Sequence, residues 1–131
     1  MYLGIDLGDK RCGIAIYVEK VVIPKEIIPR VKIIDSLKKY IKEYKIQTIV
    51  VGLPFDLYEK DKKQLEKTQK FIEKLKNIFP EINIEGVDER FSSFEAESIL
   101  SFMGEKDFFG KKDAISAGII LETFLQKNKI Y

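Results

Sequence analysis

Residues 2–18 read YLGIDLGDKRCGIAIYV, and this stretch predicts a β-hairpin at the start of the fold. Its first half alternates apolar residues with Gly4, Asp6 and Gly8, which is the period-two pattern of a strand. A turn then leads into a second apolar run over residues 13–18. Asp and Gly are both disfavoured in strands, so Asp6 is a candidate functional residue in a space that small neighbours leave open. The alternative is that the glycines let a helix pack closely and that Asp6 has a structural role.

The hydrophobic pattern of the remaining chain predicts an α/β fold. The expected elements are a strand over 21–28, a helix over 34–44, a strand over 48–53, a helix over 65–79, a strand over 82–87, a helix that begins at the capping box 92–95, a loop over 104–112 and a helix over 113–125. Pro24 places the third strand at a sheet edge. The order β-β-β-α-β-α-β-α-α predicts one domain, residues 1–131, with a five-stranded mixed sheet and helices on both faces.

The composition of the 131 residues limits the chemistry that the chain can perform. It contains no His, and its one Cys is Cys12. Catalysis that needs a Ser-His or Cys-His pair is therefore excluded, as are His-bearing zinc sites and an intrachain disulfide. Carboxylates with a metal that prefers oxygen ligands, or a Lys or Ser, remain as candidates.

The net charge is only +2, from 23 basic and 21 acidic residues, so any basic surface must come from local clustering. Residues 59–76 hold seven Lys and four acids, and residues 30–45 hold six basic residues and two acids. Both segments are interpreted first as solvated helix faces. The sequence has no apolar run long enough for a membrane helix and no recognisable signal peptide, so we expect a cytoplasmic protein without membrane contact.

Two further groups of acidic residues lie where active sites often form. Asp88 and Glu89 follow the predicted fifth strand, and strand ends in open α/β sheets are common ligand sites. Asp113 begins the last predicted helix, where an acid is also expected from the helix dipole alone. A solvated turn at Asp88–Arg90 is the corresponding structural alternative. The three arginines are Arg11, Arg30 and Arg90, against 20 lysines, and the positions of Arg11 and Arg90 inside the acidic motifs suggest that guanidinium geometry matters there.

Four segments in this order resemble the motifs of the YqgF/RuvX family, nucleases of the Holliday-junction-resolvase type with an RNase H-type fold. Residues 4–15 (GIDLGDKRCGIA) resemble the opening motif G-I-D-x-G-x-K-R-x-G-x-A, and residues 51–54 match V-G-L-P. Residues 88–97 (DERFSSFEAE) resemble D-E-R-[apolar]-[ST]-[ST]-x-x-A-E, and residues 112–121 (KDAISAGIIL) resemble the closing segment. The resemblance covers essentially the whole chain. One departure is residues 55–59 (FDLYE), where the family usually has an Asn and then a Gly.

The resemblance implies an RNase H-like active site. Its catalytic acids would be Asp6, Asp113 and a third acid from the Asp88–Glu89 pair, with Glu89 slightly favoured. The resemblance further implies that Asp6, Glu89 and Asp113 hold one or two Mg²⁺ or Mn²⁺ ions for phosphodiester hydrolysis. The basic residues expected to contact nucleic acid are Lys10, Arg11, Arg90 and Lys112.

The resemblance also implies two biological roles, which these residues do not separate. The first is 5′ processing of the precursor of small-subunit ribosomal RNA, a step of ribosome biogenesis that could involve ribosomal particles. The second is cleavage of branched DNA as a Holliday junction resolvase. A non-catalytic RNA- or ribosome-binding domain is the alternative outside enzymes, and both a monomer and a homodimer are compatible with the sequence.

Overall fold

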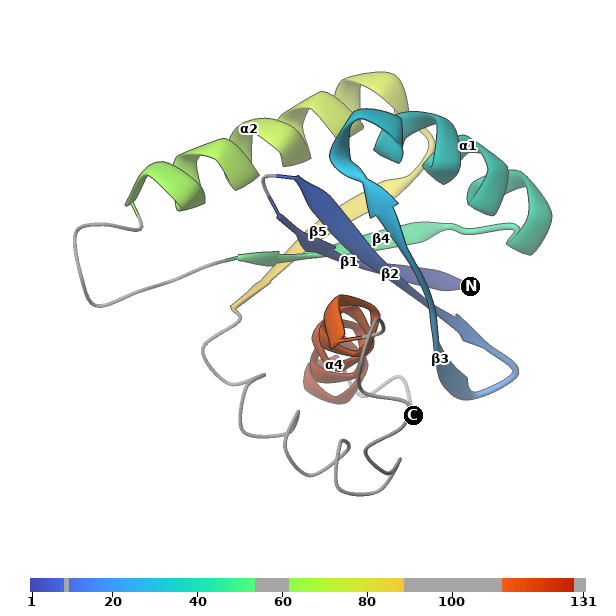
Figure 1. The fold of residues 1–131 in the computed structure, drawn as a ribbon. Helices are drawn as coiled ribbons and strands as arrows, with labels where there is room; N and C mark the ends of the chain where they lie inside the picture. The colour runs from blue at the N-terminus through green and yellow to red at the C-terminus, as the bar shows by residue number, and fades with distance from the viewer. Residues whose placement is uncertain (9, 54–61, 89–111, 129–131) are drawn as a thin grey trace.

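The computed structural model describes residues 1–8, 10–53, 62–88 and 112–128 of the chain (Figure 1). The elements in these residues are, in chain order, β1 (Tyr2–Leu7), β2 (Arg11–Val18), β3 (Val21–Pro29), the 3-10 turn η1 (Arg30–Lys32), α1 (Ile33–Tyr44), β4 (Thr48–Leu53), α2 (Lys62–Ile78), β5 (Asn83–Asp88) and α4 (Lys112–Lys127). Each predicted strand and helix in this part of the chain is present within a few residues. The predicted helix that begins at residues 92–95 lies outside the described residues, as does the loop up to residue 111.

The five strands form one mixed sheet in the order β3-β2-β1-β4-β5. The hairpin partners β1 and β2 are antiparallel, and so are β2 and β3. On the other side, β1, β4 and β5 are parallel. The strand that contains Pro24 is at the edge, as predicted, and the register shifts between Ile14 and Ala15 where β2 pairs with it.

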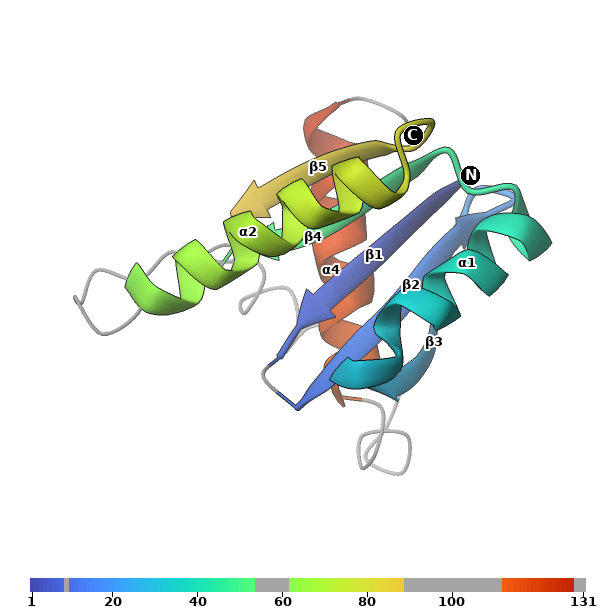
Figure 2. The ribbon, with the colours of Figure 1, turned by 90° about the horizontal axis from the view of Figure 1, so that it is seen from above.

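Helices cover both faces of this sheet (Figure 2). One face packs under α1 and α2, with a core made of alternate strand residues and the inner sides of the two helices: Leu3, Ile5, Ile14, Ile16, Ile49, Val51, Leu37, Phe71 and Leu75. The opposite face packs against α4 through Val50, Val87, Ile120, Leu121 and Leu125. The interior strand β4, between β1 and β5, is buried on both faces, as its continuous apolar sequence predicts.

Candidate active site

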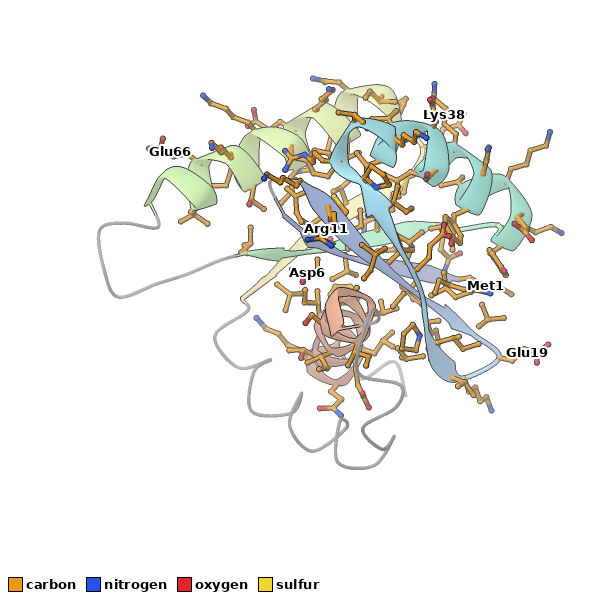
Figure 3. All side chains as sticks on the ribbon, viewed as in Figure 1. Met1, Asp6, Arg11, Glu19, Lys38 and Glu66 are labelled. Atoms are coloured by element: carbon orange, nitrogen blue, oxygen red, sulfur yellow. The ribbon has the colours of Figure 1, made fainter. Side chains whose placement is uncertain are left out.

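Asp6 lies near the carboxyl end of the central strand β1. The parallel strands β4 and β5 also have their carboxyl ends on this side of the sheet, which is called the carboxyl edge below. Asp6 follows directly after Ile5, which forms the last β1–β4 pair with Val51. Side chains of a strand alternate between faces, so Asp6 shares the face of Gly4, which packs against α4. The Asp6 side chain is half-buried and lies next to the near end of α4 (Figure 3).

The course of α4 across β1 brings the first turn of this helix to Asp6. The rings of Tyr2 and Phe124 lie 6.1 Å apart, and Gly4 faces Ala117 and Leu121. Residue numbers therefore fall along α4 as they rise along β1. From Gly4 to Asp6 the strand advances about 6.6 Å. From residue 117 to residue 113 the helix advances about 6 Å, so the backbone of Asp113 lies at the level of Asp6.

Gly4 permits this close approach because it has no Cβ atom. A Cβ at Gly4 would lie 2.7 Å from the Ala117 carbonyl oxygen and 2.9 Å from Leu121 Cβ. The interpretation that a glycine lets a helix pack closely is thus correct for Gly4. At Gly8, a glycine is required by the hairpin turn and not by the helix. Its N–H donates to the Arg11 carbonyl at 2.9 Å, and a Cβ there would lie 2.5 Å from the same oxygen. The two glycines beside Asp6 fix the helix on one side and the hairpin turn on the other.

The other predicted acids are described only in part. Asp88 is the last residue of β5 and pairs with Leu53, so its backbone lies at the same edge of the sheet as Asp6. Asp113 lies in the first turn of α4. The side chains of these two residues lie outside the described part, as do Glu89 and Arg90. The described residues include Asp6 but not the side chains of its predicted partners. Among these described residues, no group of three or more potential metal ligands occurs.

Two of the predicted basic residues are exposed at this end of the hairpin: Lys10 on the turn between β1 and β2, and Arg11 at the start of β2. Arg11 and Asp6 are close to the same end of the hairpin (Figure 3). The third and fourth, Arg90 and the side chain of Lys112, lie outside the described part.

Arg30 joins the hairpin turn to the helical layer, a role that was not predicted from the sequence. Its Nη1 donates to the Gly8 carbonyl at 2.8 Å, and its backbone N–H donates to the Lys10 carbonyl at 2.8 Å. Its guanidinium carbon lies 5.2 Å from the centre of the Phe71 ring on α2. The scarcity of arginine in a lysine-rich chain could have indicated this residue, since a planar fork suits a carbonyl and an aromatic face better than an ammonium does.

The sheet order, the helices on both faces and the acid at the end of the first strand define an RNase H-like α/β domain. In agreement, the chain resembles RuvC from Thermus thermophilus, with a TM-score of 0.58, 10% identity and coverage of 98% of this chain and 96% of that one. The same protein in complex with a Holliday junction substrate gives a TM-score of 0.59 at 11% identity, over 97% of this chain and 94% of that one. At this level of identity, these likenesses concern the fold.

The family model of RuvX, described as Holliday junction resolvase, matches residues 1–127, and the chain belongs to this family. A protein of Sulfurihydrogenibium sp. is 40% identical over 95% of this chain and 89% of its own length. A protein of Fusobacterium nucleatum is 36% identical over 98% of both chains. Both relatives have the name "Putative pre-16S rRNA nuclease". The resemblance seen in the four sequence motifs is thereby confirmed.

Two further expectations concern residues away from this edge. Cys12 is fully buried in the core, as expected for a thiol that acts as a small apolar side chain. None of the helices in the described part of the chain has the length and apolar character that spanning a membrane requires.

Proposed function

We propose that this single-domain protein, residues 1–131, is a divalent-metal-dependent nuclease that processes the 5′ side of the small-subunit ribosomal RNA precursor. The observation that favours it most is the position of Asp6, at the carboxyl edge of the sheet and level with the first turn of α4. Two carboxylates from these elements can share a cation, which supports phosphodiester hydrolysis without a histidine. The names of the relatives support the choice of RNA substrate.

The proposed catalytic acids are Asp6, Asp113 and Glu89, with Asp88 next to them. Val87 packs on the α4 face, and alternation along a strand assigns every second residue to the same face. This pattern favours Glu89 over Asp88 as the third acid. Carboxylate oxygens are the ligands that Mg²⁺ and Mn²⁺ prefer, so this donor set fits either ion and disfavours zinc.

Each group of residues then has a defined task. Asp6, Asp113 and Glu89 would hold the cation, and a bound cation would supply Lewis-acid chemistry for phosphodiester hydrolysis. Lys10 and Arg11, on the exposed turn, would neutralise phosphates next to the cleaved bond, together with Arg90 and Lys112. Arg30 keeps that turn in place through its bond to Gly8. The half-buried position of Asp6 reduces the competition of bulk water for the cation.

Cleavage of a precursor rRNA 5′ fragment tests this function. We expect the wild-type protein to cut it with Mn²⁺ or Mg²⁺ and the Asp6→Asn and Asp113→Asn variants to lose at least a hundredfold in rate, because each removes a charged ligand. Asp35→Asn is the matched control, since Asp35 is an exposed acid on α1, on the opposite face of the sheet from α4. If Asp6→Asn cuts as fast as Asp35→Asn, the proposed site is wrong.

The family description favours a second substrate, the Holliday junction. The same assay with a four-way DNA junction decides between them: a preference for the junction would assign the resolvase function, and the same acids would still be required. If neither substrate is cut but RNA is bound, the non-catalytic binding domain is correct. We further propose a cytoplasmic location, contact with ribosomal particles and action as a monomer or homodimer, of which the homodimer suits a two-fold junction.

A further inference from the structure

Each of the helices on the face opposite α4 has a row of lysines along one side. On α1 and its C-terminal cap, Lys38, Lys42 and Lys45 follow at spacings of four and three. On α2, Lys67, Lys70 and Lys74 follow at spacings of three and four. Residues at such spacings lie above one another on a helix, and all six are exposed. We refer to these six residues as the lysine stripes.

The stripe on α1 lies on the side of the helix that is turned toward α2. The other side is fixed by contacts to β3 at the sheet edge: Tyr40 Oη donates to Glu26 at 2.8 Å, and Lys25 Nζ lies 5.2 Å from the centre of the Tyr44 ring. Lys38 and Lys42 are each two residues from Tyr40, about 200° around the helix. They are therefore on the side away from β3, and Lys38 projects away from the sheet (Figure 3).

The stripe on α2 is turned toward α1. Phe71 marks that side, because its ring contacts Arg30 in η1, directly before α1. Lys67 precedes Phe71 by four residues and Lys74 follows it by three, so both share its side of the helix. The two stripes thus face each other across the helical layer, and Figure 2 shows α1 and α2 side by side on this layer.

The charge of this layer is strongly positive and little neutralised. Residues 33–45 and 62–78 together hold ten Lys and four acids. The acids are Asp35, Glu43, Glu66 and Glu73. Asp35 precedes Lys38 by three residues, and Glu66 and Glu73 lie four residues before and three after Lys70, so the lysines outnumber the acids on these sides without excluding them. This layer therefore has a net charge of six positive units, with lysines on the side of each helix that is turned toward the other helix.

The stripes begin at the proposed active-site edge. Both helices start at the end of the sheet where β1 ends, and the hairpin turn with Lys10 and Arg11 lies there too. Arg30 connects that turn to the helical layer, and Lys32 is exposed next to it. A continuous series of cations therefore leads from the turn beside Asp6 onto the stripes.

We propose that the lysine stripes bind the sugar-phosphate backbone of the substrate RNA, at a segment away from the cleaved bond. The proposal rests on the proposed function, because it names a second contact surface for the same substrate. A phosphate backbone is the partner that fits two facing rows of ammonium groups on a layer in which lysines outnumber acids by ten to four. The substrate would then extend from the catalytic edge over the opposite face of the sheet.

The test compares two four-site variants with the same change in net charge. Lys38→Gln/Lys42→Gln/Lys70→Gln/Lys74→Gln removes most of the stripes. Lys20→Gln/Lys39→Gln/Lys76→Gln/Lys127→Gln removes exposed lysines elsewhere. Fluorescence anisotropy with a labelled duplex RNA from the precursor 5′ flank, in EDTA, gives Kd over a range of salt concentrations. For the stripe variant we expect Kd to rise at least tenfold and the slope of log Kd against log salt to fall by about 3. We expect less than a threefold change for the control.

Equal losses in the two variants, or no loss in either, would overturn the proposal. Circular dichroism and the thermal unfolding midpoint check that both variants are folded. With the long substrate, the stripe variant should raise KM and change kcat by less than twofold, which separates backbone binding from damage to the active site. If wild type binds RNA through the stripes and cleaves nothing, the nuclease function fails and the binding surface stands.

Discussion

At Gly4 a single missing Cβ atom sets the distance between α4 and the sheet. The nearest atoms to that position are a backbone oxygen and a Cβ of α4, and neither can move without shifting the helix. Gly118 lies within α4 on the side toward β2 and β3, and a Cβ there would meet nothing closer than Val22 Cγ1 at 3.4 Å. The two glycines of this interface therefore differ in the space around them.

We expect Gly4→Ala to lower the free energy of unfolding by about 1–3 kcal/mol, because the added methyl overlaps the helix backbone. Gly118→Ala should be neutral or raise it by up to about 1 kcal/mol, because alanine is favoured over glycine inside a helix. Urea unfolding of the two variants measures the difference. Equal stability of the two variants would show that α4 does not pack on Gly4 in this way.

The charged side chain of Arg30 contacts both the turn between β1 and β2, at Gly8, and the Phe71 ring on α2. We expect Arg30→Met to lower the free energy of unfolding by about 1–2 kcal/mol, since a charge-assisted hydrogen bond to Gly8 is lost from a half-buried site. Lys32→Met is the control, as an exposed residue of the same turn with an expected effect within about 0.5 kcal/mol. If the two variants unfold at the same urea concentration, the Arg30 contacts contribute nothing to stability.

At the scale of elements, α1 is attached to the edge strand β3 through Tyr40 and Glu26. Burial raises the pKa of Tyr40 above its usual value of 10.0, and the hydrogen bond to Glu26 raises it further. A group with a raised pKa in the folded state contributes stability that is fully present below about pH 10. This stability is lost at higher pH, because the unfolded chain releases the proton first.

Ultraviolet titration of tyrosinate measures this directly. Tyr40 is one of six tyrosines, and it should lose its proton at a pH above the usual tyrosine pKa of 10.0. The Tyr40→Phe variant should therefore lack the step of the wild-type titration at the highest pH. Glu26→Gln should move that step to lower pH, because it removes the negative charge and keeps an acceptor. A Tyr40→Phe curve that differs from wild type only in a step near pH 10 would contradict the contact.

The sequence predicted the elements well and their contacts less well. Alternation and helical spacing are local properties, so the five strands and three described helices could be located from them. The bounds differ where pairing extends a strand: β2 begins at Arg11, two residues earlier than predicted, because Arg11 pairs with Pro29. More than one side of α4 is buried, since Ile115 and Ile119 are buried together with Ala117 and Leu121.

The candidate site was predictable only as far as motifs and strand ends define it. Asp6 and the start of the last helix could be named, because both are local features of the sequence. The role of Arg30 could not, since it depends on a turn and a helix that are distant in the chain meeting at one residue. The orientation of the lysine stripes likewise depends on which side of α1 contacts β3, which spacing alone does not give.

At the scale of the whole molecule, the acids and the lysine stripes lie on different parts of the surface. Asp6 lies on the α4 side of the sheet, where the metal site is proposed, and the stripes lie on the α1–α2 side. Clustered carboxylates repel one another without a cation, so the edge is expected to destabilise the metal-free protein and to be stabilised when Mn²⁺ binds. The central claim is that Asp6 and Asp113 hold this cation together.

The thermal unfolding midpoint with and without Mn²⁺ tests this claim most directly. A cation at a hundred times its Kd stabilises a folded protein by about 2.7 kcal/mol, so the wild-type midpoint should rise by several degrees. Asp35→Asn should show the same rise, whereas Asp6→Asn and Asp113→Asn should show none, and without metal both should be at least as stable as wild type. A rise in Asp6→Asn or Asp113→Asn equal to that of wild type would contradict the account.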